Sequence, residues 1–276
     1  MIRNLKQYCE GTLNYSPFYK SSLPNAGAMR YVDLSMGAGT PKFNAYVGGQ
    51  YEATVLTGSG NAGIYVGSGD RYVNRLTVNT TTANSIPCHL MLCDYLMFYP
   101  LIDLDSTDLQ ELDNTATLTR YTDGVNVQVM AVVTTPMAAS VNCNVNYTNA
   151  LGVDVTTSFT LISNANIGGI ISSASTQSTA TTANSPFLPI KDGCRKINSI
   201  QLVGSAGGFA SFVLVKPLIQ LALLELGVPN ELEPVRQMGQ MKKIYNGAYL
   251  NFVALQGGSA GATGIQGILE TMKVEE

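Results

Sequence analysis

The densest group of potentially catalytic side chains in this sequence is acidic: Asp103, Asp105, Asp108, Glu111 and Asp113. Paired carboxylates act as acid and base in glycoside hydrolysis, and clustered carboxylates also bind Ca²⁺. Asp103 and Asp105 are therefore the candidate pair for a glycan depolymerase. The run lacks the glycine and the spacing of an EF-hand loop, and Asp108 fits the first turn of a short helix. We favour a solvated turn and leave cation binding by this cluster open.

Two other motifs predict less chemistry than their residue types suggest. His89 is the single histidine and follows Cys88, but neighbouring residues of a strand point to opposite faces, so the two cannot form a dyad. A glycine run at 58–63 matches the GxGxxG pattern, yet Ile64 begins a strand-like segment where a dinucleotide fold needs a helix. The sequence therefore predicts no catalytic residue, no metal site and no cofactor.

The cysteines are odd in number and irregular in spacing: Cys9, Cys88, Cys93, Cys143 and Cys194. None of the spacings is typical of a zinc or redox motif. The first twenty residues contain no apolar signal segment, and no apolar run reaches the roughly 20 residues of a membrane span. We expect a protein made in a reducing cytoplasm, whose free thiols serve as small buried apolar groups.

Charge is scarce along this chain of 276 residues, since Asp, Glu, Lys and Arg make up 13% of it, against about 25% in typical domains. The net charge of −3 gives no electrostatic reason to expect nucleic acid or an anionic membrane as a partner. Residues 121–190 contain only Asp123 and Asp154 as charged side chains. Because interspersed charge normally keeps monomers apart, this long neutral stretch favours a surface that contacts other protein.

The hydrophobic pattern predicts an all-β fold, a β-sandwich or jelly roll. Apolar residues alternate through Val125–Val133 and again from Val141 to Tyr147, the period of a half-buried strand. Long apolar runs at 88–101 and 209–224 predict central strands with both faces covered. Helix is expected only in short pieces, near 107–113 and 234–245.

Residues 1–29 lack a regular pattern and predict an irregular N-terminal arm ahead of a β body at 30–276. The aromatic side chains of the arm are candidate anchors on a neighbouring subunit: Tyr8, Tyr15, Phe18 and Tyr19. The body contains a weak internal echo, in which residues 71–78 resemble residues 195–202 and each copy leads into an apolar run that ends in Pro-Leu-Ile. Two related β subdomains are one interpretation; the other is two strands in equivalent positions.

Three segments, 30–42, 90–110 and 121–124, resemble virion structural proteins of tailed bacteriophages, and the likeness extends over most of residues 28–220. The resemblance implies a β-sandwich or jelly-roll protein of the particle, of the capsid cement or decoration type, and brings no catalytic residues. The chain departs from the major capsid protein of such phages, whose fold needs a long spine helix, because no window shows a long helical period.

The resulting expectation is a non-enzymatic virion protein that stabilises a phage head through protein–protein contacts. Its partners would be the major capsid protein or other virion proteins, and it would form a homo-oligomer assembled in the host cytoplasm, with no nucleic acid or membrane partner. A receptor-binding or tail- and neck-associated protein of the same virion is the alternative. The depolymerase using Asp103 and Asp105 is the third hypothesis.

Overall fold

The computed structural model describes residues 10–20, 30–58, 62–80, 86–172, 185–257 and 264–274. Antiparallel strands in three sheets form almost all of the regular structure, so the predicted all-β fold is confirmed. The terminal sheet has the order β13 (Asn230–Leu232), β5 (Arg71–Thr80), β16 (Ile265–Lys273), β1 (Thr12–Lys20) and β3 (Gly39–Thr40), with β14 (Lys243–Ile244) on β5. The central sheet has the order β2 (Arg30–Asp33), β15 (Leu250–Gln256), β6 (Cys88–Asp103), β12 (Phe209–Leu223) and β8 (Gln128–Thr135), with β4 (Thr54–Val55) on β6. The distal sheet has the order β10 (Asp154–Leu161), β9 (Val141–Thr148), β11 (Lys196–Val203) and β7 (Gln110–Glu111).

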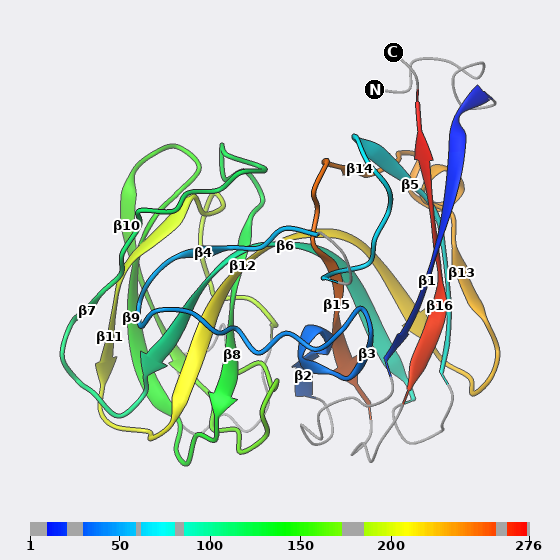
Figure 1. Cartoon of the computed structure of the whole chain (residues 1–276). Helices are drawn as coiled ribbons and strands as arrows, with labels where there is room; N and C mark the ends of the chain where they lie inside the picture. The colour runs from blue at the N-terminus through cyan, green and yellow to red at the C-terminus, as the bar shows by residue number, and fades with distance from the viewer. Residues whose placement is uncertain are drawn as a thin grey trace.

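The two longest strands, β6 and β12, hold the molecule together. They pair antiparallel from Phe209 opposite Asp103 to Leu223 opposite Cys88, and Figure 1 shows them crossing from the distal sheet on the left to the terminal sheet on the right. Each strand is long enough to contribute one half to the lobe built on the distal sheet and the other half to the lobe built on the terminal sheet. Both faces of each strand are therefore covered, and the residues of both strands are apolar on both faces. The second half of β6 packs in the distal core and the first half in the terminal core.

The strand order of one lobe matches that of the other when β6 is exchanged with β12. In the distal sheet the order is β7-β11-β9-β10, and in the terminal sheet it is β13-β5-β16-β1. β5 leads into β6 as β11 leads into β12, and β15 pairs with the first half of β6 as β8 pairs with the first half of β12. The sequence echo falls on β5 and β11, which hold corresponding positions.

The central sheet closes on itself through a short connecting segment. The backbone N–H of Ile170 donates to the carbonyl of Tyr31 in β2, and the N–H of Ile171 donates to the carbonyl of Ala131 in β8, each at 2.9 Å. The edges of the sheet are thereby joined, and the side chains inside form a third apolar cluster, which includes Tyr95 and Ile170. Closure leaves neither β2 nor β8 as a free edge along this segment.

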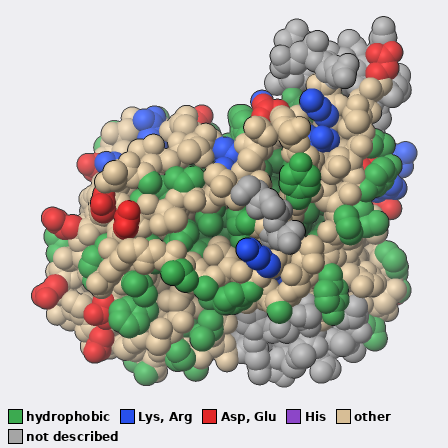
Figure 2. Space-filling model, viewed as in Figure 1, with side chains coloured by type: hydrophobic (Ala, Val, Ile, Leu, Met, Phe, Trp, Pro, Cys, Tyr) green, Lys and Arg blue, Asp and Glu red, His purple; other side chains and the backbone are tan. Residues whose placement is uncertain are grey.

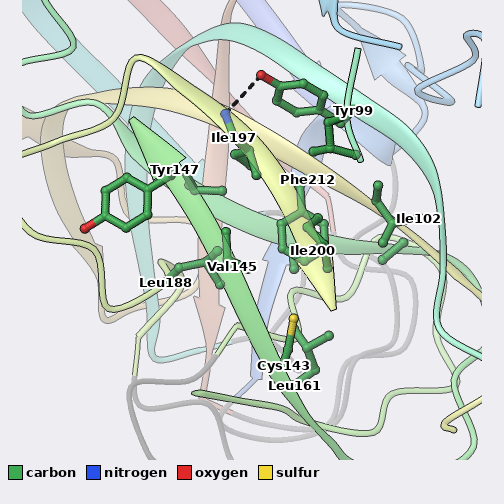
Figure 3. Close-up of a cluster of buried hydrophobic side chains, with 14 of the residues drawn as sticks. Tyr99, Ile102, Cys143, Val145, Tyr147, Leu161, Leu188, Ile197, Ile200 and Phe212 are labelled. Carbon is green, nitrogen blue, oxygen red and sulfur yellow. Dashed lines mark hydrogen bonds between the residues drawn. The ribbon is translucent and has the colours of Figure 1, made fainter. Parts of the chain in front are cut away.

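The distal core shows why the alternation along β9 was a reliable signal. Val145, Ile200 and Phe212 point into one interior from three different strands, as Figure 3 shows. Tyr99 brings a hydroxyl into this interior, where it accepts a hydrogen bond from the backbone N–H of Ile197 at 3.1 Å and donates to Asn114 Oδ1 at 2.6 Å. The buried phenol is therefore fully partnered, as burial of a polar group requires.

Two sequence expectations are wrong in part. Thr12–Lys20 is no irregular arm but strand β1, hydrogen-bonded along its whole length to β16 and flanked on the other edge by β3. No helix forms at 107–113: Gln110 begins β7, and its side-chain amide bonds the backbone N–H and C=O of Asp103 at 2.9 and 2.7 Å. The second expected helix is real but short, α2 (Pro234–Met238), and ends at Gly239 in the left-handed conformation.

Candidate interaction surface

The four predicted anchors fall into three different situations. Tyr8 lies outside the described residues. Phe18 is buried inside its own chain, with its ring centroid 4.8 Å from that of Phe252 in β15, so it is not available to a partner. Tyr15 and Tyr19 project from β1 to solvent, 58% and 44% exposed. Alternation along β1 separates these side chains. The odd-numbered residues face solvent, whereas Ser16, Phe18 and Lys20 face the interior.

The solvent face of the terminal sheet gathers apolar side chains from β1 and β16. Leu13 and Ile268 are 42% and 46% exposed and share this face with Tyr15 and Tyr19. Next to them, Glu270 is neutralised by Arg75 at 2.8 Å. We call Leu13, Tyr15, Tyr19 and Ile268 the tyrosine face. Aromatic and aliphatic side chains beside few charges are the composition of the centre of a protein–protein interface.

The outer face of the distal sheet is polar, and most of its side chains are uncharged; Asp154 of β10 is an exception and accepts hydrogen bonds from Thr148 and Asn198. Asn144 accepts from Ser158 at 2.6 Å and Asn146 donates to Thr156 at 3.0 Å, so facing strands are linked by side chains as well as by backbone. These residues belong to the charge-poor stretch 121–190. Figure 2 shows that uncharged atoms dominate the face it presents, with several acidic side chains along the distal lobe on the left. An ordered neutral surface of this kind loses little side-chain entropy when another surface covers it.

The acidic cluster forms a turn at the end of β6. Asp103 Oδ1 accepts a hydrogen bond from the backbone N–H of Asp105 at 2.8 Å, and Asp105 bonds the hydroxyl of Ser205. Asp113 accepts from both the backbone and the hydroxyl of Thr115, which lowers the pKa of its carboxyl. Asp103 and Asp113 each accept from a backbone N–H two residues ahead, a bond typical of turns, whereas Asp105 bonds a residue distant in sequence. Among the described residues, no group of three or more His, Cys, Asp and Glu side chains is placed to hold a metal ion.

The remaining sequence motifs also have defined places. His89 lies within β6, between Leu255 of β15 and Ala222 of β12. Residues 59–61 of the glycine run lie outside the described residues, and Gly63, with φ +77°, packs against the backbone of Tyr249. Within the described ranges, no helix has the length and apolarity to cross a membrane.

Four cysteines are free and buried: Cys88, Cys93, Cys143 and Cys194. Cys9 lies outside the described residues. Cys88 belongs to the terminal core and Cys93 to the cluster inside the central sheet, so the two thiols lie on opposite faces of β6 and do not form a disulfide. Burial raises the pKa of the Cys88 thiol to about 12, which keeps it protonated and unreactive at neutral pH.

Two sets of buried charged side chains lie inside the fold, and no sequence pattern indicated either. Asp33 is fully buried and accepts from the Ser35 hydroxyl at 2.8 Å, from Tyr95 at 2.7 Å and from Tyr46. Burial raises the pKa of Asp33, and these hydrogen bonds oppose the rise. Lys20 at the end of β1 is also buried, donates to the carbonyls of residues 37 and 41, and has its pKa lowered by burial to about 8.

The second set of buried charged side chains is the ion pair between Asp94 and Arg120. Asp94 of β6 is fully buried, and Arg120, on the connection between β7 and β8, reaches it with Nη2 at 2.9 Å and Nε at 3.0 Å. The same guanidinium donates to the carbonyls of Leu56 and Tyr95, each at 3.0 Å, and the N–H of Tyr249 donates to Asp94. Burial raises the pKa of Asp94 and Arg120 opposes this. The pair ties three connecting segments to the middle of the central sheet.

Comparison with known proteins adds little. No protein-family profile and no curated protein sequence matches the chain. Among solved structures, infectious bursal disease virus Gt strain aligns at 13% identity, over 96% of this chain and 82% of the viral chain, with a TM-score of 0.19. The VP2 subviral particle of infectious bursal disease virus aligns at 9% identity, over 96% and 81% of the two chains, with a TM-score of 0.18. At these scores neither structure supports an argument about function.

Proposed function

We propose that this chain is a non-enzymatic structural protein of a tailed-bacteriophage virion, a cement or decoration protein that binds the major capsid protein through protein–protein contacts. The observation that carries the proposal is the tyrosine face, where Leu13, Tyr15, Tyr19 and Ile268 are all exposed on adjacent strands. Tyrosine side chains on a rigid strand lose little entropy on binding and are common energetic anchors of interfaces.

Three further features support this proposal. The sequence resembles virion structural proteins of tailed phages over most of residues 28–220. The polar outer face of the distal sheet, most of whose side chains are uncharged, offers a second surface at the opposite end of the molecule, so one copy can bridge two neighbours. Contacts repeated over many copies add up through multivalency even where each is weak.

The first experiment asks whether the protein is in the particle. Quantitative mass spectrometry of purified virions should find it in fixed proportion to the major capsid protein. Its absence from purified particles would overturn the proposal.

The second experiment tests the tyrosine face. A double substitution, Tyr15→Ser with Tyr19→Ser, should leave the β circular dichroism spectrum unchanged and weaken binding to particles by about 1–3 kcal/mol for each lost anchor. The matched control is Leu151→Ser, which removes a side chain that is 74% exposed in the turn between β9 and β10. Unchanged particle binding by the folded double variant would refute the role of this face.

A further inference from the structure

The loops that join corresponding strands of the two lobes meet at an aromatic contact. Tyr121 lies between β7 and β8, and Tyr245 lies between β14 and β15. Their rings are edge to face, with centroids 4.8 Å apart and an interplanar angle of 89°. The hydroxyl of Tyr121 also donates to the carbonyl of Lys243 at 3.3 Å. The two loops are thus fixed to each other over the middle of β12.

Two adjoining hollows flank this contact, with volumes of about 400 and 470 Å³. Both are lined by Tyr121, Tyr245 and Lys216, so they form one continuous depression, the lysine–tyrosine groove. The amides of Asn126 and Gln128 line the first hollow. Its volume falls within the range of small-molecule sites, and the junction between two lobes is a common place for them.

Lysines give the groove its charge, in a protein whose net charge is negative. Lys242 and Lys243 line the first hollow together with Lys216. Lys216 Nζ lies 5.2 Å from the centroid of the Tyr121 ring, and Lys243 Nζ lies 4.5 Å from that of Tyr245. Cationic ammonium groups held against tyrosine rings are partly ordered before any ligand arrives.

Most of these cations already have an acidic neighbour. Lys243 pairs with Asp70 at 2.6 Å. Burial lowers the pKa of Lys216; Asp123 opposes this shift and Lys242 adds to it. Within the described ranges, Lys242 has no carboxylate at ion-pair distance. The groove therefore has room for one additional negative charge, next to Lys216 and Lys242.

We propose that the lysine–tyrosine groove binds a sugar residue that carries a single carboxylate, as part of an acidic glycan. The carboxylate would accept hydrogen bonds from Lys216 and Lys242, and the amides of Asn126 and Gln128 would bond the ring hydroxyls. The C–H groups of a sugar ring pack well against the faces of aromatic rings, where the ring quadrupole is negative. A nucleic-acid strand fits worse, because its successive phosphates would lie close to Asp123 and Asp70. This inference concerns the isolated protein and does not depend on a role in the virion.

The test uses the full-length protein and two probes that differ only in the carboxylate, methyl β-D-glucuronide and methyl β-D-glucoside. Titration followed by NMR of the ¹⁵N-labelled protein should show saturable shifts at residues of both loops with the glucuronide only. Lys242→Gln should weaken this binding about tenfold, the loss of one charge-assisted hydrogen bond. Lys42→Gln removes an equal charge from an exposed position that does not line the groove and should leave the affinity unchanged.

Five results would overturn the proposal. The glucuronide causes no shift in the NMR signals of the groove residues. The glucoside binds as tightly as the glucuronide, which would remove the role of the carboxylate. Lys42→Gln weakens binding as much as Lys242→Gln, which would make the attraction non-specific. Acetyl-glutamate amide binds as tightly as the glucuronide, which would remove the role of the sugar ring. An oligothymidylate binds more tightly than the glucuronide, which would make the groove a nucleic-acid site.

Discussion

Replacing Arg120 by Leu should destabilise the protein more than most single substitutions. The side chain of Arg120 is 5% exposed and that of Asp94 is fully buried, so water cannot replace the lost partner. The substitution removes both hydrogen bonds to Asp94 and those to the carbonyls of Leu56 and Tyr95. Asp94 keeps only the N–H of Tyr249. Breaking a buried pair in this way typically costs about 3–5 kcal/mol.

The cost should depend on pH in a defined direction. Burial already raises the pKa of Asp94 above its usual value, and Arg120 opposes that shift. Without Arg120 the pKa of the folded state rises further, so the folded variant binds a proton that the unfolded chain releases above about pH 4. In the variant, protonated Asp94 therefore favours the folded state at low pH, and this stabilisation is lost as the pH rises. The free energy of unfolding of the variant should fall further below that of the parent at pH 7 than at pH 5.

Urea unfolding of the parent and of Arg120→Leu at pH 7 and pH 5 measures both effects as changes in midpoint at constant slope. The matched control is the double variant Arg120→Leu with Asp94→Asn, which removes the buried charge and should recover part of the loss. A deficit of less than about 1 kcal/mol for the single variant would contradict the expected cost of a broken buried pair. A double variant no more stable than the single one would show that the unpaired carboxylate is not its source.

Two further predictions concern the cores. Because burial raises the pKa of Cys88 to about 12, its thiol should react with a disulfide reagent at pH 8 only after denaturant is added; fast reaction of the folded protein would contradict its burial. Unfolded thiols ionise near pH 8.5 while the folded thiol does not, so the free energy of unfolding should fall as the pH rises above that value. Phe18→Ala should cost about 3–5 kcal/mol because the ring is buried against Phe252, whereas Tyr15→Ala on the opposite face of β1 should cost far less; equal costs in urea unfolding would show that β1 is not docked.

The strands that could be predicted from the sequence are those whose inward positions are apolar. β9 alternates Val141, Cys143, Val145 and Tyr147 toward the core, and β6 and β12 are apolar on both faces. β1 was missed because its pattern is inverted: Ser16 and Lys20 face inward, where they are hydrogen-bonded. A period-2 search that scores only hydrophobicity places that strand the wrong way round.

The features of the candidate sites depend on contacts between distant segments. At 107–113 a capping pattern predicted a helix. The side chain of Gln110 instead bonds the backbone of Asp103, and this side-chain-to-backbone bond competes with the helix in a way that local helix propensity does not describe. Tyr121 and Tyr245 are far apart in sequence, and no sequence pattern indicated that their rings meet. Arg120 and Asp94 carry no sequence sign of being partners, because burial of a charge is decided by the packing of the whole molecule.

The placement of β1 affects the order in which the protein can fold. All strands of the distal sheet lie between Gln110 and Val203, and the first half of β12 that covers them follows directly. The terminal sheet instead needs Thr12 to meet Lys273 across nearly the whole chain. Contacts of long sequence separation form slowly because their loop-closure entropy is lost first. On a ribosome, we therefore expect the distal lobe to be complete while β1 still lacks its partner, so that the backbone of Thr12–Lys20 stays unpaired along this edge until Ile265–Lys273 has emerged.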